Sequence, residues 1–342
     1  MRQDKKSPTI QDVARESGVS VSTVSRVLND KDDVAAETYE RVHNVIRKMG
    51  YTSSLAARSM RSHRTNVIGL IVPDVEDSFS IQVMKGVNRA ITEIDFDLIA
   101  YTSGSIKRSS SAERERHYVS LLNTSITDGI IIVTPSTTTF STAAPVVAVD
   151  ANTESPECPS VSATNLAGAL SVMQYLLGLG HRRIGFIRGR SDLESANQRL
   201  EGYRAALLRA GIAIDPALIA QGDFTCERGY RSAQELLALP VRPTAIFAAN
   251  DQSAIGTIRA ARDAGLSVPE DLSVVGFDNI PEAAYMTPTL TTVDQFIDHM
   301  GYVATEMLIR LIQGEPLERD PYKMPTQLIV RRSCRAIGDG VR

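Results

Sequence analysis

The sequence lacks the features that mark secreted and membrane proteins. Its three cysteines, Cys158, Cys226 and Cys334, are far apart and odd in number. They indicate free thiols in a reducing compartment, and they fit neither a disulfide framework nor a metal site. No stretch approaches the ~20 apolar residues that a membrane span needs, and the charged start "MRQDKKSPTI" is not followed by the apolar run of a secretory signal. We therefore expect a cytoplasmic protein.

Catalytic and cofactor motifs are missing as well. No Gly-rich phosphate loop of the Walker A or G-x-G-x-x-G type follows a predicted strand, and "GFIRGR" matches neither pattern. The histidines are scattered and give no spacing typical of a zinc site or a catalytic triad. We expect no cofactor and no metal, and we expect that the protein is not an enzyme.

Charge is unevenly distributed along the chain. The 342 residues are enough for two or three domains, and their net charge is −3. Residues 1–65 hold twelve Lys and Arg against eight Asp and Glu, whereas the remainder has a net charge of −7. A small basic head on an acidic body is typical of a protein whose one end meets nucleic-acid phosphates. A solvated basic terminus is the alternative.

Three short helices are predicted in the head. The first begins at Thr9 with a capping-box pattern and ends at Gly18 after about two turns. Ser20 can cap the second, whose apolar stripe is formed by Val24, Val27 and Leu28. The third lies in "AAETYERVHNVIRKMG" and ends at Gly50. Three short helices with a tight turn between the first two match the helix-turn-helix motif.

The second of these helices carries a separate polar face. Spacings of i, i+3, i+4 and i+7 bring together Ser22, Ser25, Arg26 and Asn29. In a helix-turn-helix the second helix enters the major groove, where short hydroxyl, amide and Arg side chains reach phosphates and base edges. A solvated polar face is the alternative, but it does not explain why long Lys and Glu side chains are scarce there.

"TIQDVARESGVSVSTVSRVLN", followed by "ETYERVHNVIRKMGY", resembles the head of the LacI/GalR family of bacterial transcription regulators, and the resemblance continues along nearly the whole chain. It implies that Val21 and Ser22 choose the operator bases. It further implies that the helix is anchored to the DNA backbone and bases by Thr23, Ser25, Arg26 and Asn29. Ser20, at the start of the helix, belongs to the same DNA-binding set.

The segment "SLAARSMRSHRTN" resembles the hinge helix of that family. Family members order this helix on DNA and insert it into the minor groove at the centre of the operator. By resemblance Ala57 and Met60 occupy the minor-groove positions. Met60 replaces the usual Leu wedge; it is apolar enough to enter a base step but loses more entropy when it is ordered. A merely basic linker is the alternative.

From Val67 onward, short apolar runs alternate with helical stretches. The runs predicted as buried strands are "VIGLIV", "FDLIAY", "GIIIV", "VVAV", "RIGFI", "AIFA" and "SVVGF". Alternation of strands and helices predicts doubly wound parallel sheets, and the length allows two sheets of about 130 residues each. The Ser-rich run at 102–116 is expected to form a mobile surface loop near the mouth of a cleft.

Polar and aromatic residues follow the predicted strands. Ligands in such folds bind beyond the carboxyl ends of the strands, which are the positions of Phe79, Asp150, Arg199, Phe224, Asn250 and Asp278. Phe79 is expected in the loop after "VIGLIV". Carboxylates, an amide and an Arg pair with hydroxyl groups, and aromatic rings cover the apolar face of a sugar. The set therefore predicts a site for a polyhydroxylated ligand, although each residue alone is also explained as a helix cap or a core residue.

The family resemblance places the same six residues in an effector pocket, with Phe79, Asp150 and Phe224 as its walls. It is carried by "RLEGYRAAL", "ANDQSAIGTIRAARDAGLSVPEDLSVVGFDN" and "PTLTTVDQ". The body resembles periplasmic sugar-binding proteins, whose two lobes are linked by three crossovers. The segment that normally reads Asn-Pro-Phe-Phe is here "DSFS", so that Ser80 replaces the second Phe. The tail lacks the leucine heptads by which some relatives form tetramers.

We therefore expect an N-terminal all-α helix-turn-helix head and an α/β periplasmic-binding-protein-like body of two doubly wound parallel-sheet lobes. The head would span 1–52, the hinge 53–65, the body 66–334 and the tail 335–342. The first lobe would combine 66–164 with 294–325, and the second would combine 165–293 with 326–334.

The function expected from these features is that of a homodimeric, nucleoid-associated regulator, most simply a repressor. It would bind a pseudo-palindromic operator in double-stranded DNA under the control of a small-molecule effector, most simply a carbohydrate. One alternative is a sugar-binding receptor or transport component that does not bind DNA. Another is an α/β enzyme acting on sugars with Asp150 and Asp278 as acid and base, which the nearby Arg199 disfavours because it keeps a carboxylate ionised.

Overall fold

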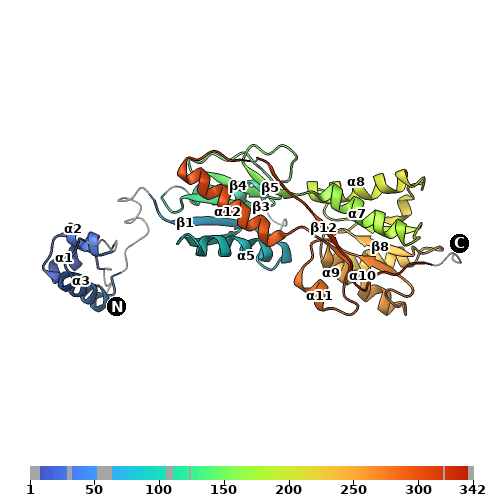
Figure 1. Cartoon of the computed structure of the whole chain (residues 1–342), viewed down its shortest axis with the longest axis horizontal. Coiled ribbons are helices and arrows are strands. Elements are labelled where there is room, and N and C mark those ends of the chain that lie inside the picture. The colour runs from blue at the N-terminus through green and yellow to red at the C-terminus, as the bar shows by residue number, and fades with distance from the viewer. Residues whose placement is uncertain are drawn as a thin grey trace, which may run out of the picture. The chain divides into compact units, whose positions relative to one another are not determined.

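The computed structural model describes residues 8–28, 33–51, 64–104, 111–122, 125–318 and 320–337. The chain divides into two compact units, 1–65 and 66–342, which we call the head and the body. Each is described by itself (Figure 1).

The head consists of three helices, as predicted. Their bounds are α1 Ile10–Ser17, α2 Val21–Leu28 and α3 Ala36–Met49. The predicted capping box is confirmed, because the Thr9 hydroxyl accepts the Asp12 amide at 3.3 Å while the Asp12 carboxylate accepts the Thr9 amide at 3.0 Å. Gly18 and Gly50 end α1 and α3 with φ angles of 67° and 63°, a left-handed conformation that favours glycine.

One small core holds these helices together. Val13 of α1, Val24 and Val27 of α2, and Val42 of α3 are at most 1% exposed, and Tyr51 packs beside them. A two-turn helix is not stable alone, so the stripes that the three helices share are what fix the angle between α1 and α2.

Six parallel strands form the first sheet of the body, in the order β11-β5-β4-β3-β1-β2. Their bounds are β1 Val67–Val72, β2 Asp97–Thr102, β3 Gly129–Val133, β4 Val146–Val149, β5 Ser160–Ala163 and β11 Tyr322–Met324. The sheet face that includes Leu70 is covered by α5 (Ser78–Thr92) and α12 (Ile297–Gln313), and the face that includes Ile71 is covered by α6 (Ser111–Leu121). We call this sheet with its helices the first lobe (Figure 1).

The second sheet has four parallel strands in the order β7-β6-β8-β9. Their bounds are β6 Ile184–Ile187, β7 Ile219–Ala220, β8 Ala245–Ala248 and β9 Ser273–Val275. Helices α7 (Asn165–Gly178) and α8 (Glu194–Arg209) cover one face, and α9 (Cys226–Leu237) and α10 (Asp251–Asp263) cover the other. A 3₁₀ turn, Pro216–Leu218, precedes β7, and α11 (Pro281–Tyr285) follows β9. These elements form the second lobe.

The chain passes between the lobes at three places. β5 leads directly into α7, β10 (Thr292–Asp294) leads from the second lobe into α12, and β12 (Gln327–Ile329) leads back from β11. β10 and β12 pair as antiparallel strands. The returning chain then joins the second sheet, where the Val274 amide donates to the Ser333 carbonyl at 2.9 Å. Two of the three crossovers are therefore bound to each other.

Within the first lobe, α5 and α12 cross at two glycines. A Cβ atom on Gly86 would lie 1.7 Å from the Asp298 carbonyl oxygen, and one on Gly301 would lie 2.2 Å from the Val83 carbonyl oxygen. The two backbones are therefore in direct contact. This crossing fixes the position of α5, whose first turn faces the space between the lobes.

Two predictions about local structure are wrong. Phe79 lies in the first turn of α5 and not in a loop, because the Asp77 carboxylate caps the helix by accepting the Ser80 amide at 3.0 Å. The Ser-rich run is not a loop throughout its length, because 111–116 form the first turns of α6; residues 105–110 lie outside the described part.

Candidate functional site

Helix α2 turns its polar residues outward from the core of the head. Val24 and Val27 are buried on one side, whereas Val21, Ser22 and Arg26 are exposed. The helix has no acidic residue, and Arg26 stands in its last turn. On a helix that includes no acid and whose exposed side chains apart from Arg26 are short, hydroxyl and guanidinium groups can approach phosphates and base edges. The exposure of Val21 on this surface suits contact with a thymine methyl group.

The hydroxyl groups at the start of α2 form a small network. The Ser20 hydroxyl accepts the Thr23 amide at 3.1 Å, so that it caps the helix as predicted. The same oxygen lies 2.7 Å from the Ser22 hydroxyl and 2.8 Å from the Thr23 hydroxyl. At the other end, Arg26 forms an exposed ion pair of 3.3 Å with Asp33. These bonds hold the side chains in place before any ligand is bound.

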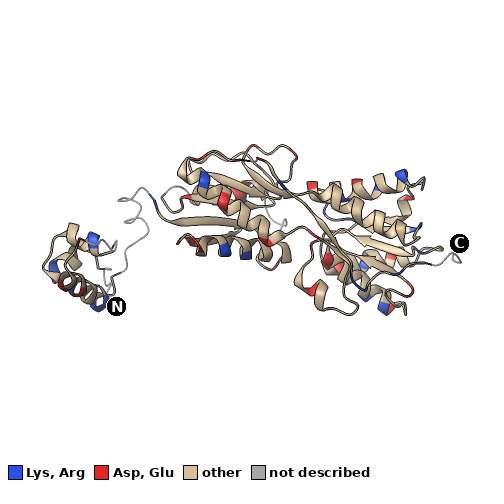
Figure 2. Cartoon of the chain, in the orientation of Figure 1, with Lys and Arg blue, Asp and Glu red and all other residues tan. Residues whose placement is uncertain are grey.

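Asn29, Ala57 and Met60 lie outside the described residues, and their roles stay predictions. Both signs of charge occur on the head; in α3, Glu37 lies in the first turn and Arg47 and Lys48 in the last (Figure 2). This arrangement opposes the helix dipole at each end and stabilises the helix.

A cavity of about 480 Å³ lies between the two lobes of the body. All six residues predicted for the effector pocket line it: Phe79, Asp150, Arg199, Phe224, Asn250 and Asp278. They come from α5, from the ends of β4 and β9, from α8, from the loop before α9, and from the start of α10. The structure thus brings together residues that are up to two hundred positions apart, while their role in binding stays a prediction.

Three of these six residues have an unusual backbone conformation. Asp150, Phe224 and Asp278 have φ angles of 53°, 74° and 114°, although none of them is glycine. Such conformations cost on the order of 1–3 kcal/mol each and cluster at binding sites. Because such conformations destabilise the fold, stability alone does not explain why three of them occur beside one cavity. A ligand-binding site would explain it.

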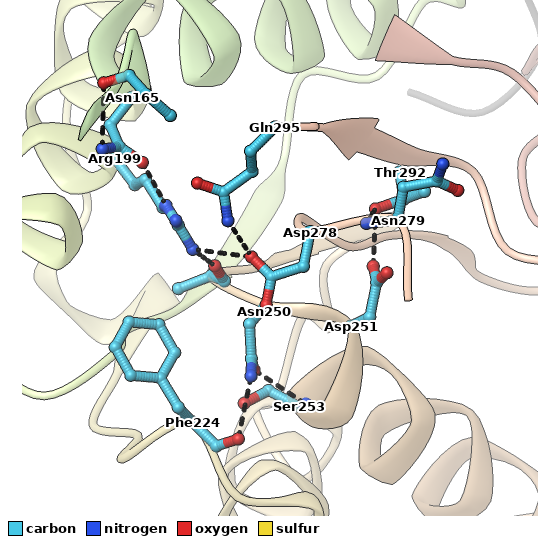
Figure 3. A network of polar contacts seen from close by, with 12 residues as sticks. Asn165, Arg199, Phe224, Asn250, Asp251, Ser253, Asp278, Asn279, Thr292 and Gln295 are labelled. Atoms are coloured by element: carbon cyan, nitrogen blue, oxygen red, sulfur yellow. Dashed lines mark hydrogen bonds and ion pairs between the residues drawn. The ribbon is translucent and has the colours of Figure 1, made fainter. Parts of the chain in front are cut away.

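Arg199 is the buried centre of the polar network in the cleft (Figure 3). Its Nε donates to the Asn165 side chain at 2.9 Å, and its Nη1 donates to the Ala249 carbonyl at 2.6 Å and to Asp278 Oδ1 at 3.3 Å. The guanidinium also stacks over Phe277, at 3.9 Å from the ring centre. Burial lowers the pKa of Arg199, and the negative charge of Asp278 opposes this effect.

Two pocket carboxyl groups bind protons more readily than usual. Burial raises the pKa of Asp278 to about 7, against the opposing charge of Arg199, and Asp77 and Asp150 raise it further. The pKa of Asp150 is raised by burial as well. Gln295, directly after β10, donates to Asp278 Oδ1 at 2.5 Å. A carboxyl group that contacts the cleft is thereby joined to a crossover strand (Figure 3).

Asn250 is a helix cap, which is the structural alternative that the sequence left open for it. Its Oδ1 accepts the Ser253 amide at 3.0 Å and caps α10, while its Nδ2 donates to the Phe224 carbonyl at 2.9 Å. It therefore holds the aromatic wall in position in addition to lining the cavity.

Comparison with known proteins decides the family. A family described as "Bacterial regulatory proteins, lacI family" matches residues 9–54, and a "Periplasmic binding protein-like domain" matches 173–334. The HTH-type transcriptional repressor CytR of Escherichia coli strain K12 is 34% identical over 336 residues, which cover 96% of this chain and 97% of that protein. The chain belongs to the LacI family. This LacI-family chain is a DNA-binding transcriptional regulator, and its predicted fold class is confirmed.

Other members of the LacI family match over similar lengths. The repressor PurR of Vibrio atlanticus strain LGP32 is 31% identical and covers 96% of this chain and 99% of its own. Among solved structures, a lac repressor dimer bound to operator and an anti-inducer aligns with a TM-score of 0.83 at 26% identity, over 97% of this chain and all of that one. A CelR–cellobiose complex aligns with a TM-score of 0.70 at 32% identity, over 95% and 99% of the two chains.

The sequence did not identify several residues of this LacI-family cleft. Asp77 lies two positions before the predicted Phe79 and Asp223 lies one position before the predicted Phe224, so extending the search by one or two positions would have found them. Glu115 was hidden because its helix was interpreted as a loop. Gln295, which contacts the pocket residue Asp278, stands in the quoted "PTLTTVDQ", but no apolar run marked β10 as a strand.

Within the described residues, no group of three or more His, Cys, Asp or Glu side chains is arranged to hold a metal ion. Among the helices described, none has the length and apolar character required to cross a bilayer.

Proposed function

We propose that this regulator is a repressor that binds a pseudo-palindromic operator as a homodimer, and that a small hydroxylated molecule in the cleft controls its affinity for DNA. It would act in the cytoplasm on the nucleoid, without a cofactor. The observation that carries the effector part is the convergence of the six predicted residues on one cavity. The dimeric, operator-bound lac repressor and the cellobiose-bound CelR support the two halves of the proposal.

In the head, Val21 and Ser22 would choose bases, and Thr23, Ser25 and Arg26 would anchor α2 to the DNA. The exposed Arg26 is the group best able to make a bidentate contact. The proposed hinge, 53–65, would enter the minor groove with Met60 as its wedge. Two heads related by a two-fold axis would read two half-sites of one operator.

In the cleft, Asp150 and Asp278 would accept hydrogen bonds from ligand hydroxyl groups, and Arg199 would donate one. Phe79 and Phe224 would cover the apolar face of the ligand. Because the residues belong to both lobes, a ligand favours whichever arrangement of the lobes brings all of them into contact with it. The ligand can change the free energy of DNA binding only by as much as its own binding free energy differs between the two arrangements of the lobes, typically 1–3 kcal/mol.

Direct contacts between the lobes border this cleft. The Asn152 amide group, after β4, donates to the Asp192 carbonyl and accepts the Glu194 amide at 2.7 Å. Gln252 of α10 donates to the Ser78 hydroxyl of α5 at 3.2 Å. These bonds would break or change when the lobes move, so they contribute to the energy difference between the two arrangements.

Selection of bound duplexes from a random-site library tests the DNA part. We expect a pseudo-palindromic consensus, with an affinity that falls steeply with salt because phosphate contacts release counterions. A protein that shows no preference among duplexes at low ionic strength would contradict the proposal.

A thermal-shift screen of sugars and nucleosides, followed by operator-binding titrations, tests the effector part. A compound that binds the native cleft raises the melting temperature by mass action, and it should change operator affinity; the sign of that change distinguishes an inducer from a corepressor. We expect Asp150→Asn to weaken the compound and Asp271→Asn, outside the cavity lining, to leave it unchanged. Equal loss in both variants, or a compound with no effect on DNA binding, would refute the pocket.

A further inference from the structure

The cleft has far more negative than positive charge. Its lining includes seven acidic residues and two arginines. Both arginines face a carboxylate: Arg190 pairs with Asp192 at 2.6 Å, and Arg199 pairs with Asp278 at 3.3 Å. Among the described residues, no ion pair is formed by the other five acidic groups: Asp74, Asp77, Glu115, Asp150 and Asp223.

These carboxylates are held by neutral donors, so their charge is positioned but not cancelled. Glu115 is 3% exposed and accepts the Ser111 hydroxyl at 2.8 Å and the Ser136 amide at 2.9 Å. At the rim, Asp77 accepts the Ser80 amide at 3.0 Å, and Asp223 accepts the Thr225 amide at 2.9 Å. Backbone and hydroxyl donors fix a carboxylate in one orientation without supplying a full positive charge.

The charges are arranged in two layers. Asp74, Asp77 and Asp223 are exposed, whereas Asp278 and Glu115 are buried. Exposed charges around a recess attract an approaching ion over a distance of about a Debye length. The deep carboxylates act at shorter range and in a less polar medium, where they discriminate more strongly between ligands of different charge.

The carboxylates of the two layers also raise the proton affinity of Asp278. The pKa of Asp278 reaches about 7 through burial, and the carboxylates of Asp77 and Asp150 contribute to the increase while Arg199 opposes it. The cleft without a ligand therefore favours taking up a positive charge. A ligand cation can supply that charge in place of a proton.

We propose that the effector is a hydroxylated molecule that carries a protonated nitrogen, as an amino sugar or an aminonucleoside does, and that the cleft excludes phosphorylated ligands. This inference rests on the cleft being the effector site. Hydroxyl groups suit the surplus of acceptors in the lining, and the ammonium group suits the carboxylates that form no ion pair. A phosphate would face a lining in which acidic residues outnumber arginines by seven to two.

Two sets of compounds matched for shape test the inference on the full-length protein. One set is D-glucosamine, D-glucose and D-glucose 6-phosphate; the other is 5′-amino-5′-deoxyadenosine, adenosine and adenosine 5′-monophosphate. Affinities are measured by calorimetry at neutral pH. In at least one set we expect the amine to bind on the order of tenfold more tightly than its neutral counterpart, which corresponds to about 1.4 kcal/mol, and the phosphate not to bind. Neutral or phosphorylated compounds that bind as tightly as the amines, or a failure of all six to bind, would overturn the inference.

The variant Asp77→Asn separates charge from fold, because Asn caps a helix as well as Asp does. We expect it to reduce the ratio of amine to neutral affinity severalfold. Asp271→Asn, a surface change whose side chain accepts only the Ser267 amide, should leave the ratio as it is. An unaltered ratio in Asp77→Asn would count against the inference. Because these measurements involve no DNA, a missing operator would leave their outcome unaffected, and the two proposals can fail separately.

Discussion

The proton affinity of Asp278 predicts how the stability of the body depends on pH. Its pKa rises from an ordinary value of 3.8 to about 7 in the folded chain, mainly through burial. A carboxyl group with a raised pKa stabilises the folded state at low pH, and this contribution is lost as the pH rises through the folded-state pKa. We therefore expect the body to lose stability between about pH 5 and pH 8 and the variant Asp278→Asn, which cannot ionise, to lose less.

The size of the effect follows from the same two values. One unit of pKa difference corresponds to 1.36 kcal/mol, so Asp278 alone should account for about 3 kcal/mol between about pH 5 and pH 8. Asp278 is 8% exposed, so solvent screening is weak. For a body of this size, 1 kcal/mol shifts the melting temperature by about 2 °C.

Melting curves of both proteins across this pH range measure the difference. Asp251, whose pKa is also raised well above its usual value, remains in both and contributes the same sign of slope. The reasoning would be refuted if the two curves ran parallel, or if the variant lost more stability with rising pH than the natural chain.

Three further predictions concern the head and the helix crossing. Arg26→Ala should weaken binding to a selected duplex by about tenfold or more, the value of one good bidentate base contact. As a control, a cleft ligand should still raise the melting temperature of this variant. Intact duplex binding in a gel-shift assay would contradict the role of α2. Thr9→Ala should destabilise the head by about 1 kcal/mol, because α1 loses its N-terminal cap. The measurement is the thermal unfolding transition of the head, followed by its helical circular dichroism signal. An unchanged transition would show that the capping box is not needed. Gly86→Ala should destabilise the body by about 3 kcal/mol or more, because the new methyl group would lie 1.7 Å from the Asp298 carbonyl oxygen. The control Gly178→Ala, whose methyl group meets no atom within 4 Å, should be neutral or stabilise the body by up to about 1 kcal/mol. Equal melting temperatures for these two variants would disprove the close crossing of α5 and α12.

The sequence predicted well those elements whose pattern is local. The helices of the head have strong apolar stripes and end signals such as Gly18 and Gly50, and all three are confirmed. The seven long apolar runs all correspond to strands, and six of them are buried throughout. The prediction of a buried strand is wrong for "FDLIAY", because β2 lies at the edge of its sheet and its residues are half-buried or exposed. In each case the residues that define the element lie within a few positions of one another.

Elements that depend on distant partners were not predicted. β5 has the sequence "SVSA", which is too polar to be recognised, yet it is fully buried because β4 and β11 flank it. β10 and β12 have three residues each and exist because they pair with each other. The same holds for the cleft. Positions after strands identified six of its residues. Glu115 lines the cleft from a helix, and Gln295 holds the pocket residue Asp278 from a crossover, and no local pattern predicted either.

The three crossovers have a consequence for how this protein is made. The first sheet is complete only when β11, at Tyr322–Met324, pairs with β5, and one of its faces is covered only when α12 is in place. Both elements come near the end of the chain, so a nascent polypeptide emerging from the ribosome carries an unfinished first lobe for most of its synthesis. Contacts of such large sequence separation form slowly and leave apolar strands open to aggregation in the meantime. A premature stop after the second sheet would therefore remove part of the first lobe, and neither lobe can be produced as one continuous fragment.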